Sequence, residues 1–301
     1  MPRNYPRVSA SPPDRAPAKL LAFGEHTVLH GSSAYAVPLR RFGARLGLGE
    51  GASARSETFV AWRRYAAARP GLGEALDLAA WAREAPRLAL ASDIPQGYGL
   101  GSSGALTALV YRRYARATGE PDREVLARLE GFFHGRSSGL DPLVSLLDAP
   151  VVVRAGGEAE GVPEGASLLP RLTPAGRWFL LDSGVPRAGG EAIARFGERC
   201  ADAAWRGEVL APMVGCVDAL VTGAVAGAAG GLAPKLRTLS ALQREHLRFL
   251  IPDDVGERWG RWLAEDAAWL KLCGAGGGGV FLGYAPRGEL PDGGGLEVSG
   301  L

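Results

Sequence analysis

Residues 95–104 read Pro-Gln-Gly-Tyr-Gly-Leu-Gly-Ser-Ser-Gly. This run lies between a short apolar segment, residues 88–91, and a segment with helical spacing, residues 105–114. Glycines let a backbone turn tightly and bring its N–H groups against an anion, and the start of the following helix adds the positive end of its dipole. The pattern therefore predicts a phosphate-binding loop between a strand and a helix.

The spacing of this loop matches neither of the two common nucleotide-binding fingerprints. It contains no GxxxxGK[ST] sequence and no strict GxGxxG sequence with an acidic residue about 20 positions later. Taken alone, the loop indicates an anion at a helix N-terminus, and a plain glycine-rich turn with a serine N-cap remains the alternative. The candidate phosphate-binding residues are Gly97, Gly99, Leu100, Gly101, Ser102, Ser103 and Gly104.

Three further segments carry compatible chemistry. Residues 19–31 read KLLAFGEHTVLHG, residues 130–141 read EGFFHGRSSGLD, and residues 271–283 read KLCGAGGGGVFLG. The middle segment places two carboxylates, Glu130 and Asp141, on either side of a Gly/Ser turn. Four such segments in one chain favour phosphoryl chemistry over an isolated glycine-rich turn.

With these segments the chain resembles the GHMP small-molecule kinases, and among them the mevalonate kinases most. The motifs are APAKLLAFGEH at 16–26, IPQGYGLGSSGA at 94–105, HGRSSGLD at 134–141 and KLCGAGGGGV at 271–280. The resemblance implies an α+β fold with two lobes: a mixed-sheet N-terminal lobe like that of ribosomal protein S5, and a ferredoxin-like C-terminal lobe. It also implies transfer of a phosphoryl group from ATP to a small-molecule alcohol.

The chain departs from the family pattern at four places. Ala18 replaces a glycine of the first motif, Ser137 stands where proline is common, and Pro142 follows the aspartate where asparagine is frequent. After Arg187, the threonine of a further family motif is missing. These differences affect the identity of the acceptor more than the type of reaction.

The resemblance also assigns roles to individual residues. Asp141 is the expected catalytic base, and the ammonium of Lys19 would favour its charged form. Ser103 and Glu130 are the expected ligands of Mg²⁺, which prefers a few hard oxygen donors and keeps several waters. The residues expected to line the acceptor pocket are Glu25, His26, Gly274, Ala275 and Gly276.

Each of these residues also has an ordinary structural interpretation. Glu130 would be a solvated helix residue, Asp141 the N-cap of a helix with Pro142 at its first position, and His26 a satisfied histidine at the end of a strand. We expect His30 and His134 to be structural, because each precedes a glycine at a turn. Lys271 would complement the dipole at the end of a helix.

Composition excludes several classes of protein. The chain has 301 residues and a formal net charge of +2, with no long basic run and no apolar stretch of about 18 uncharged residues. We therefore expect no nucleic-acid or membrane partner. The three sparse cysteines suggest a reducing cytoplasm. Only Lys19, Lys235 and Lys271 among 34 Lys plus Arg residues are lysine, which suggests that a compact ammonium matters where one is kept.

The expected organisation is a flexible tail (1–15), an N-terminal lobe (16–165) and a C-terminal lobe (166–301). Helical spacing appears at 56–69, 73–84 and 123–133, with Trp62 and Trp81 in the core. Residues 272–284 read as one glycine-interrupted strand. The expected acceptor is mevalonate, converted to 5-phosphomevalonate by a monomer or homodimer. The alternatives are a phosphomevalonate kinase, a diphosphomevalonate decarboxylase, a sugar kinase or a non-catalytic metabolite sensor.

Overall fold

The computed structural model describes residues 14–51, 55–116, 119–162, 169, 172–173, 175–187, 189–227, 231–292 and 295–297. Residues 1–13 of the predicted tail and the predicted lobe boundary at 165–166 lie outside these ranges. The chain divides into two compact units. The described parts of Met1–Leu20, Ala36–Pro95 and Leu100–Val151 form unit 1, and those of Leu21–Tyr35, Gln96–Gly99 and Val152–Leu301 form unit 2.

One sheet contains β1 (Arg15–Phe23), β2 (Ala34–Leu48), β3 (Leu88–Ser92), β4 (Val151–Val153) and β5 (Ala159–Gly161). Its order is β1-β2-β4-β5, and β3 pairs with β2 off this path. The β2–β3 pair is antiparallel, with Ala44 opposite Ser92 and Leu48 opposite Leu88. Seven of the nine residues of β1 are buried, which indicates that both faces of the strand are covered.

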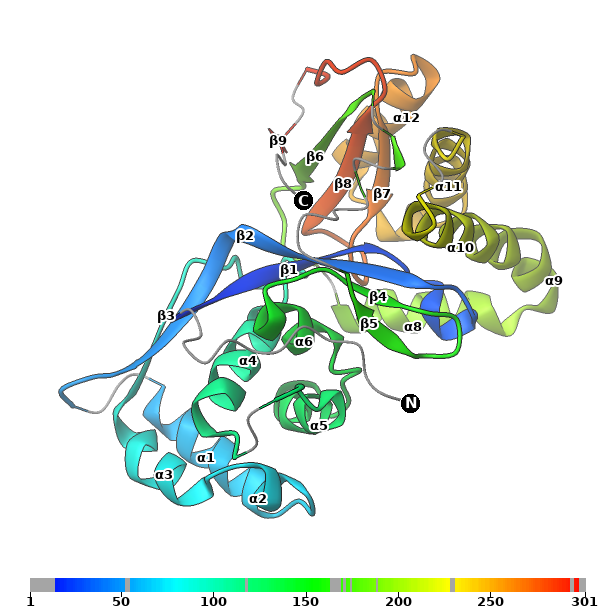
Figure 1. Ribbon diagram of the computed structural model, residues 1–301. Coiled ribbons are helices and arrows are strands. Elements are labelled where there is room, and N and C mark those ends of the chain that lie inside the picture. Colours follow the sequence, from blue (N-terminus) through cyan, green and yellow to red (C-terminus); the bar gives the residue numbers. More distant parts are fainter. Residues whose placement is uncertain are drawn as a thin grey trace. The chain divides into compact units, whose positions relative to one another are not determined.

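The helices of unit 1 are α1 (Ser56–Ala67), α2 (Leu72–Ala75), α3 (Leu78–Glu84), η2 (Ala85–Arg87), α4 (Ser102–Tyr114), α5 (Arg123–His134) and α6 (Leu140–Leu147). The predicted helix at 73–84 is broken, because Asp77 accepts hydrogen bonds from the N–H groups of Ala79 and Ala80 and starts a new helix. Helix α4 is buried over most of its length and packs against α5 and α6 (Figure 1). The predicted core residues Trp62 and Trp81 are fully buried and meet edge to face.

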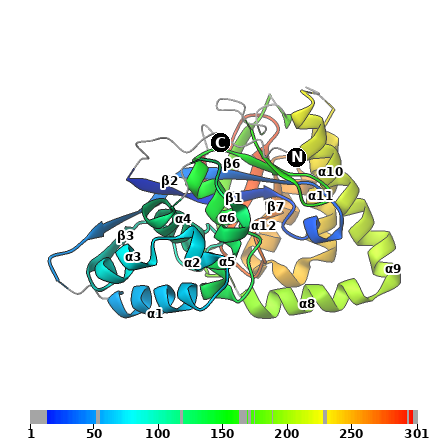
Figure 2. The ribbon, with the colours of Figure 1, turned by 60° about the horizontal axis from the view of Figure 1, so that its bottom comes forward.

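Unit 2 contains an antiparallel sheet of four strands in the order β7-β8-β6-β9. Its strands are β6 (Arg177–Asp182), β7 (Trp269–Leu272), β8 (Val280–Ala285) and β9 (Leu296–Glu297). Its helical segments are η1 (Val28–His30), α8 (Gly189–Ala201), α9 (Ala203–Trp205), the π-helical turn η3 (Arg206–Leu210), α10 (Ala211–Val225), α11 (Ala233–His246), η4 (Arg248–Leu250) and α12 (Asp253–Ala264). Helices α11 and α12 pack on β7 (Figure 1), and α10 lies beside α11 (Figure 2).

The glycine run of unit 2 is a loop, so the prediction of one strand over residues 272–284 is wrong. β7 ends at Leu272 and β8 begins at Val280. Between them, Gly274 and Gly276 to Gly279 all have positive φ, a conformation that only glycine adopts readily. Lys271 therefore belongs to a strand, and its interpretation as a helix-terminal charge is also wrong.

By length and hydropathy alone, the continuous helical segment Ala203–Val225 could cross a membrane. Its contacts within unit 2 account for its apolar residues in another way. Met213, Val217 and Leu220 are at most 2 % exposed, and the carboxylate of Asp218 accepts hydrogen bonds from the backbone N–H and the hydroxyl of Ser33. A helix with these contacts is a core helix of its unit.

Candidate active site

The last residues of the glycine loop at 97–104 form the start of α4, which belongs to unit 1. The helix begins at Ser102, three residues before the segment 105–114 in which the sequence shows helical spacing, and its N-cap is Gly101 with a φ of 72°. No side chain of the described residues caps this end, so the interpretation of a serine N-cap is wrong. The loop is tied to β1 by the backbone N–H of Lys19, which donates to the carbonyl of Leu100 at 3.0 Å. The N–H groups at the start of α4 are thus available to a hydrogen-bond acceptor on a ligand.

An ion pair between Lys19 and Asp141 lies against this helix start. The ammonium is 3.0 Å from Oδ2 of the carboxylate, and the lysine is 5 % exposed. Asp141 lies in the first turn of α6, whose N-cap is Gly139, so the N-cap interpretation of Asp141 is wrong. Its side chain remains about one-third exposed, so the carboxylate is accessible to a small molecule.

Two glycines make room for this pair. A Cβ placed on Gly101 would lie 2.7 Å from Cγ of Lys19, and one on Gly104 would lie 2.8 Å from Cβ of Asp141. Contacts this short do not occur in folded proteins, so any side chain here would displace the ion pair. Gly101 and Gly104 therefore leave the space that Lys19 and Asp141 occupy.

Glu130 forms a second cluster in unit 1. It is 3 % exposed, so the interpretation of a solvated helix residue is wrong. Ser103 donates its hydroxyl to Oε1 of Glu130 at 3.0 Å, and Ser137 donates its hydroxyl to Oε2. His134, one helical turn after Glu130, places Nε2 at 2.9 Å from the Ser103 hydroxyl oxygen.

The hydrogen-bond directions in this cluster follow from the number of protons. A hydroxyl has one proton and two lone pairs, so Ser103 cannot donate to Glu130 and His134 at once. While it donates to the carboxylate, Nε2 of His134 carries the proton of the other bond. One lone pair of the Ser103 oxygen then remains for another ligand. His134 is thus part of the cluster rather than only a turn residue.

Burial raises the pKa of Glu130 to about 7, and the nearby charge of Asp141 contributes to the rise. The hydroxyls of Ser137 and Ser103 and the charge of Lys19 act in the opposite direction and are outweighed. A buried carboxylate beside a second carboxylate gains most from a cation that neutralises both. The cluster is therefore suited to a divalent cation, because without one the Glu130 carboxylate is buried close to the negative charge of Asp141.

The donor set fits magnesium. It offers a carboxylate and a hydroxyl, both hard oxygen donors, and magnesium is commonly held by one or two carboxylates together with waters and substrate phosphates. Among the residues that the structure describes, no group of three or more His, Cys, Asp and Glu could hold a metal ion by itself. A cation here would have to share its coordination with a bound phosphate or with water.

In unit 2, the two residues after Gly24 are buried. The carboxylate of Glu25 lies 2.6 Å from the ammonium of Lys271, and the two side chains are 3 % and 1 % exposed. The ring of His26 packs on Phe196 of α8, with centroids 4.9 Å apart. Burial and the charge of Lys271 lower the pKa of His26 to about 4, so the ring is neutral near pH 7.

The loop at 273–279 is held in place by its own unit. The N–H of Gly277 donates to the carbonyl of Leu250, and a Cβ on Gly276 would lie 2.6 Å from Cβ of Leu250. A Cβ on Gly279 would lie 2.8 Å from the carbonyl oxygen of Tyr98. The predicted acceptor-pocket residues Gly274, Ala275 and Gly276 thus lie in a loop whose backbone is closely packed.

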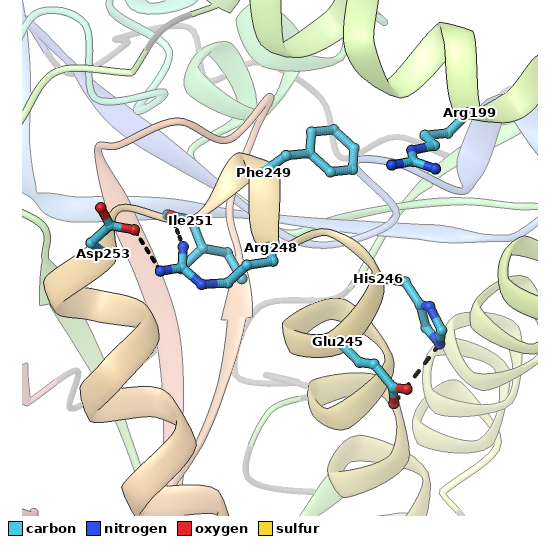
Figure 3. Close-up of a pocket in the computed structure, with 7 residues that line it drawn as sticks. All are labelled: Arg199, Glu245, His246, Arg248, Phe249, Ile251 and Asp253. Carbon is cyan, nitrogen blue, oxygen red and sulfur yellow. Dashed lines mark hydrogen bonds and ion pairs between the residues drawn. The ribbon is translucent and has the colours of Figure 1, made fainter.

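A cavity of about 620 Å³ opens in unit 2 (Figure 3). It is lined by Arg199, Glu245, His246, Arg248, Phe249, Ile251 and Asp253. Arg248 is neutralised by Asp253 at 2.6 Å. The guanidinium carbons of Arg195 and Arg199 lie 5.1 and 5.9 Å from the centroid of the Phe249 ring, and among the described residues neither arginine has a carboxylate partner. Within the described part of the chain, α8 therefore carries two arginines without carboxylate partners: Arg199 lines the cavity, and Arg195 contacts the lining residue Phe249.

The predicted residues fall into two groups. Unit 1 brings together Lys19, Ser103, Glu130 and Asp141. Unit 2 holds Glu25 and His26 near the loop at 273–279. Sequence reasoning missed the contacts of Ser137, His134 and Lys271. The spacing of four between Glu130 and His134 was a usable signal, because residues at that spacing share a helix face.

Comparisons with known proteins show what the chain is similar to. Residues 65–148 match the family model described as "GHMP kinases N terminal domain". A mevalonate kinase of Archaeoglobus fulgidus is 27 % identical, with 92 % of this chain and 93 % of that protein covered. The structure of L. major mevalonate kinase in complex with R-mevalonate covers 94 % of this chain and 90 % of its own, with a TM-score of 0.55 and 14 % identity. Lactococcus lactis galactokinase complexed with galactose covers 91 % and 85 %, with a TM-score of 0.60 and 13 % identity. The fold expected from the sequence, α+β with two lobes, is confirmed.

Replacement of Gly101 by alanine tests the close approach to Lys19. We expect Gly101→Ala to lower kcat by roughly tenfold to a hundredfold, because the new methyl group displaces the lysine from Asp141. Gly227→Ala is the matched control: Gly227 has the same φ of 72°, but no described atom lies within 4 Å of where its new methyl group would be. Steady-state kinetics and melting temperatures of both variants make the test. Equal losses of activity in the two variants would show that backbone strain, not crowding, is responsible.

The raised pKa of Glu130 has a consequence for stability. A carboxyl that binds its proton more tightly in the folded state than in the unfolded state makes the protein less stable as pH rises from about 4.5 through about 7. We expect Glu130→Gln to lack this loss. The unfolding free energy of the variant minus that of the wild type should therefore rise between pH 5 and pH 8, by up to about 3 kcal/mol. Urea denaturation in EDTA measures it. The exposed Glu124→Gln on the same helix is the control, and a Glu130→Gln profile parallel to the wild type would contradict the assignment.

Proposed function

We propose that the chain is an ATP-dependent phosphotransferase of the GHMP kinase type, which phosphorylates the primary hydroxyl of mevalonate in a magnesium-dependent reaction. Two findings support this: residues 65–148 match the model of the GHMP kinase N-terminal domain, and a mevalonate kinase is 27 % identical over 92 % of this chain. The observation that carries this proposal is the Lys19–Asp141 ion pair, 3.0 Å long and held against the first turn of the glycine loop's helix.

Asp141 is the group that takes the acceptor's proton. Its carboxylate is partly exposed, while its partner Lys19 is buried, so an acceptor hydroxyl reaches the carboxylate first. As the proton moves to Asp141, negative charge develops on the acceptor oxygen, and the ammonium of Lys19 stabilises it. The oxygen then attacks the γ-phosphorus of ATP, and ADP leaves. The base gives its proton to solvent after the product departs.

The glycine loop and α4 bind the phosphates of ATP. The uncapped N–H groups at the start of α4 and the positive end of its dipole favour the triphosphate. Glu130 and Ser103 would hold magnesium, which neutralises phosphate charge when it is bound. His134 and Ser137 hold the two ligands in position through the hydrogen bonds described above. A pure metabolite sensor would not need a base and a metal-binding carboxylate together.

One observation favours a second acceptor, phosphomevalonate. Among the described residues, Arg195 and Arg199 beside the cavity of unit 2 have no carboxylate partners, and a phosphate on the acceptor would neutralise them (Figure 3 shows Arg199). Galactose, the ligand named for the L. lactis galactokinase, is uncharged and would leave both arginines uncompensated. We therefore rank phosphomevalonate above a sugar as the alternative.

Replacement of Asp141 tests the chemical role. We expect Asp141→Asn to lower kcat by about 10²- to 10⁴-fold, because a positioned base is lost. ATP affinity should stay within a factor of about three, since the carboxylate faces the acceptor. Glu130→Gln provides the contrast: its defect should shrink as magnesium is raised, whereas that of Asp141→Asn should not. A kcat for Asp141→Asn near the wild-type value would remove Asp141 from the mechanism.

An acceptor panel tests the substrate. With ATP, we expect mevalonate to give the highest kcat/KM among mevalonate, phosphomevalonate, homoserine, galactose and shikimate, with no carbon dioxide released. Coupled ADP release and ³¹P NMR of the products measure it. Arg195→Gln/Arg199→Gln should change kcat/KM for mevalonate little and abolish any turnover of phosphomevalonate. Preference for phosphomevalonate in the wild type, lost in this variant, would reject mevalonate and retain the kinase.

A further inference from the structure

Lys271 and Glu25 form a buried ion pair in unit 2. Besides the carboxylate, the ammonium of Lys271 contacts the carbonyl of Leu272 and lies 5.6 Å from the centroid of the Phe23 ring. The lysine is 1 % exposed, so no water shell replaces these contacts. It is also one of only three lysines among the 34 cationic Lys and Arg side chains of the chain.

Such a pair is a weak source of stability. Removing two charges from water costs nearly as much as their attraction returns, and well-packed apolar side chains of similar size often do as well or better. Breaking one side of the pair is different, because it leaves a buried charge without a partner. The burial of this pair is therefore weak evidence that it serves stability.

The pair joins two segments that are 246 positions apart in the sequence. Lys271 is the third residue of β7, two positions before the glycine loop, and the backbone of β7 is in turn fixed by Gln243, whose side chain accepts the Leu272 N–H at 2.9 Å. Glu25 lies just after β1 and precedes His26. The ion pair thus connects the residue next to His26 to β7, the strand that precedes the loop at 273–279.

His26 itself has unused hydrogen-bonding capacity. Both ring nitrogens are buried and neither has a hydrogen bond of normal geometry to a described residue, although the backbone of Ala275 is near enough to oppose the fall in pKa slightly. A neutral imidazole offers one N–H donor and one nitrogen acceptor. Leaving both unmet costs free energy, so the ring is poised for a polar group that enters from outside the protein.

We propose that Lys271 is a positioning residue of the acceptor site: through its ion pair with Glu25 it holds His26 against Phe196, where the ring exchanges a hydrogen bond with an uncharged hydroxyl of the acceptor. This inference rests on the proposed function. It changes the role of Glu25, whose carboxylate holds the segment in place instead of contacting the acceptor. It also limits the groups that His26 can bind, because a neutral ring forms hydrogen bonds but no ion pair with a carboxylate of the acceptor.

Four variants separate positioning from stability. Lys271→Met removes the cation next to the Glu25 carboxylate and Glu25→Gln removes the anion next to the Lys271 ammonium, and both variants should unfold at a lower temperature than the wild type. The double variant Lys271→Met/Glu25→Gln removes both charges of the pair and should recover most of the lost stability. Lys271→Arg keeps the charge, and Lys235→Met, at an exposed lysine of α11, controls for the substitution itself.

Acceptor kinetics give the decisive comparison. We expect the double variant to fold nearly as stably as the wild type and yet to show a KM for the acceptor raised by about tenfold or more, with the KM for ATP within about twofold. Lys271→Arg should restore part of the acceptor KM. A double variant that recovers both stability and acceptor KM would overturn the proposal, because the pair would then be structural only.

Two further readouts address His26 directly. Histidine titration by ¹⁵N NMR needs no acceptor: the double variant should shift the pKa of His26 upward, because it removes a nearby positive charge and loosens the packing. An acceptor analogue that lacks the second, non-phosphorylated hydroxyl should lose affinity in the wild type and lose little more in His26→Phe. Absence of turnover with every acceptor would refute the proposed function, whereas an unchanged His26 titration would refute the role of Lys271.

Discussion

The close approach of Lys19 and Asp141 to the start of α4 is the constraint on which unit 1 depends. It requires glycine at 101 and at 104, since a methyl group at either position would occupy the space of the ion pair. It also requires α6 to begin just before Asp141, which the left-handed Gly139 allows. The helix start that we propose for phosphate binding therefore also lies against Asp141, the proposed base, so one backbone arrangement would serve both binding and chemistry.

Each unit contains a buried lysine paired with a carboxylate, and the two pairs differ in exposure. Lys19 meets a partly exposed Asp141, so one member of the pair can reach a ligand. Lys271 meets a Glu25 that is 3 % exposed, so that pair is closed to ligands. The chain uses arginine for nearly all other cations, whereas both of these pairs use a buried lysine, whose ammonium is compact and has three donors.

The sequence predicted the parts whose chemistry is local. The glycine loop and the helix that follows it were predicted from residue type and spacing, and the expected roles of the carboxylates at 130 and 141 came from the family resemblance. The burial of Glu130 and the contacts of His134 and Ser137 could not be predicted in either way, because they depend on how α4, α5 and α6 pack. The error at residues 272–284 has a similar origin: a run of glycines between apolar residues fits a weak strand or a tight loop equally well. The identity of the acceptor depends on side-chain arrangement in unit 2, where the chain departs from the family pattern after Arg187.

The central claim is that Lys19 and Asp141 act as one unit in the chemical step. Rapid-quench single-turnover rates of Lys19→Met, Asp141→Asn and the double variant, all at saturating ATP, magnesium and acceptor, test it most directly. Residues that act together lose most of their effect when either is removed, so the double variant should be about as slow as the slower single variant. A double variant slowed by the product of the two single losses would show that the residues act independently, and would contradict this account.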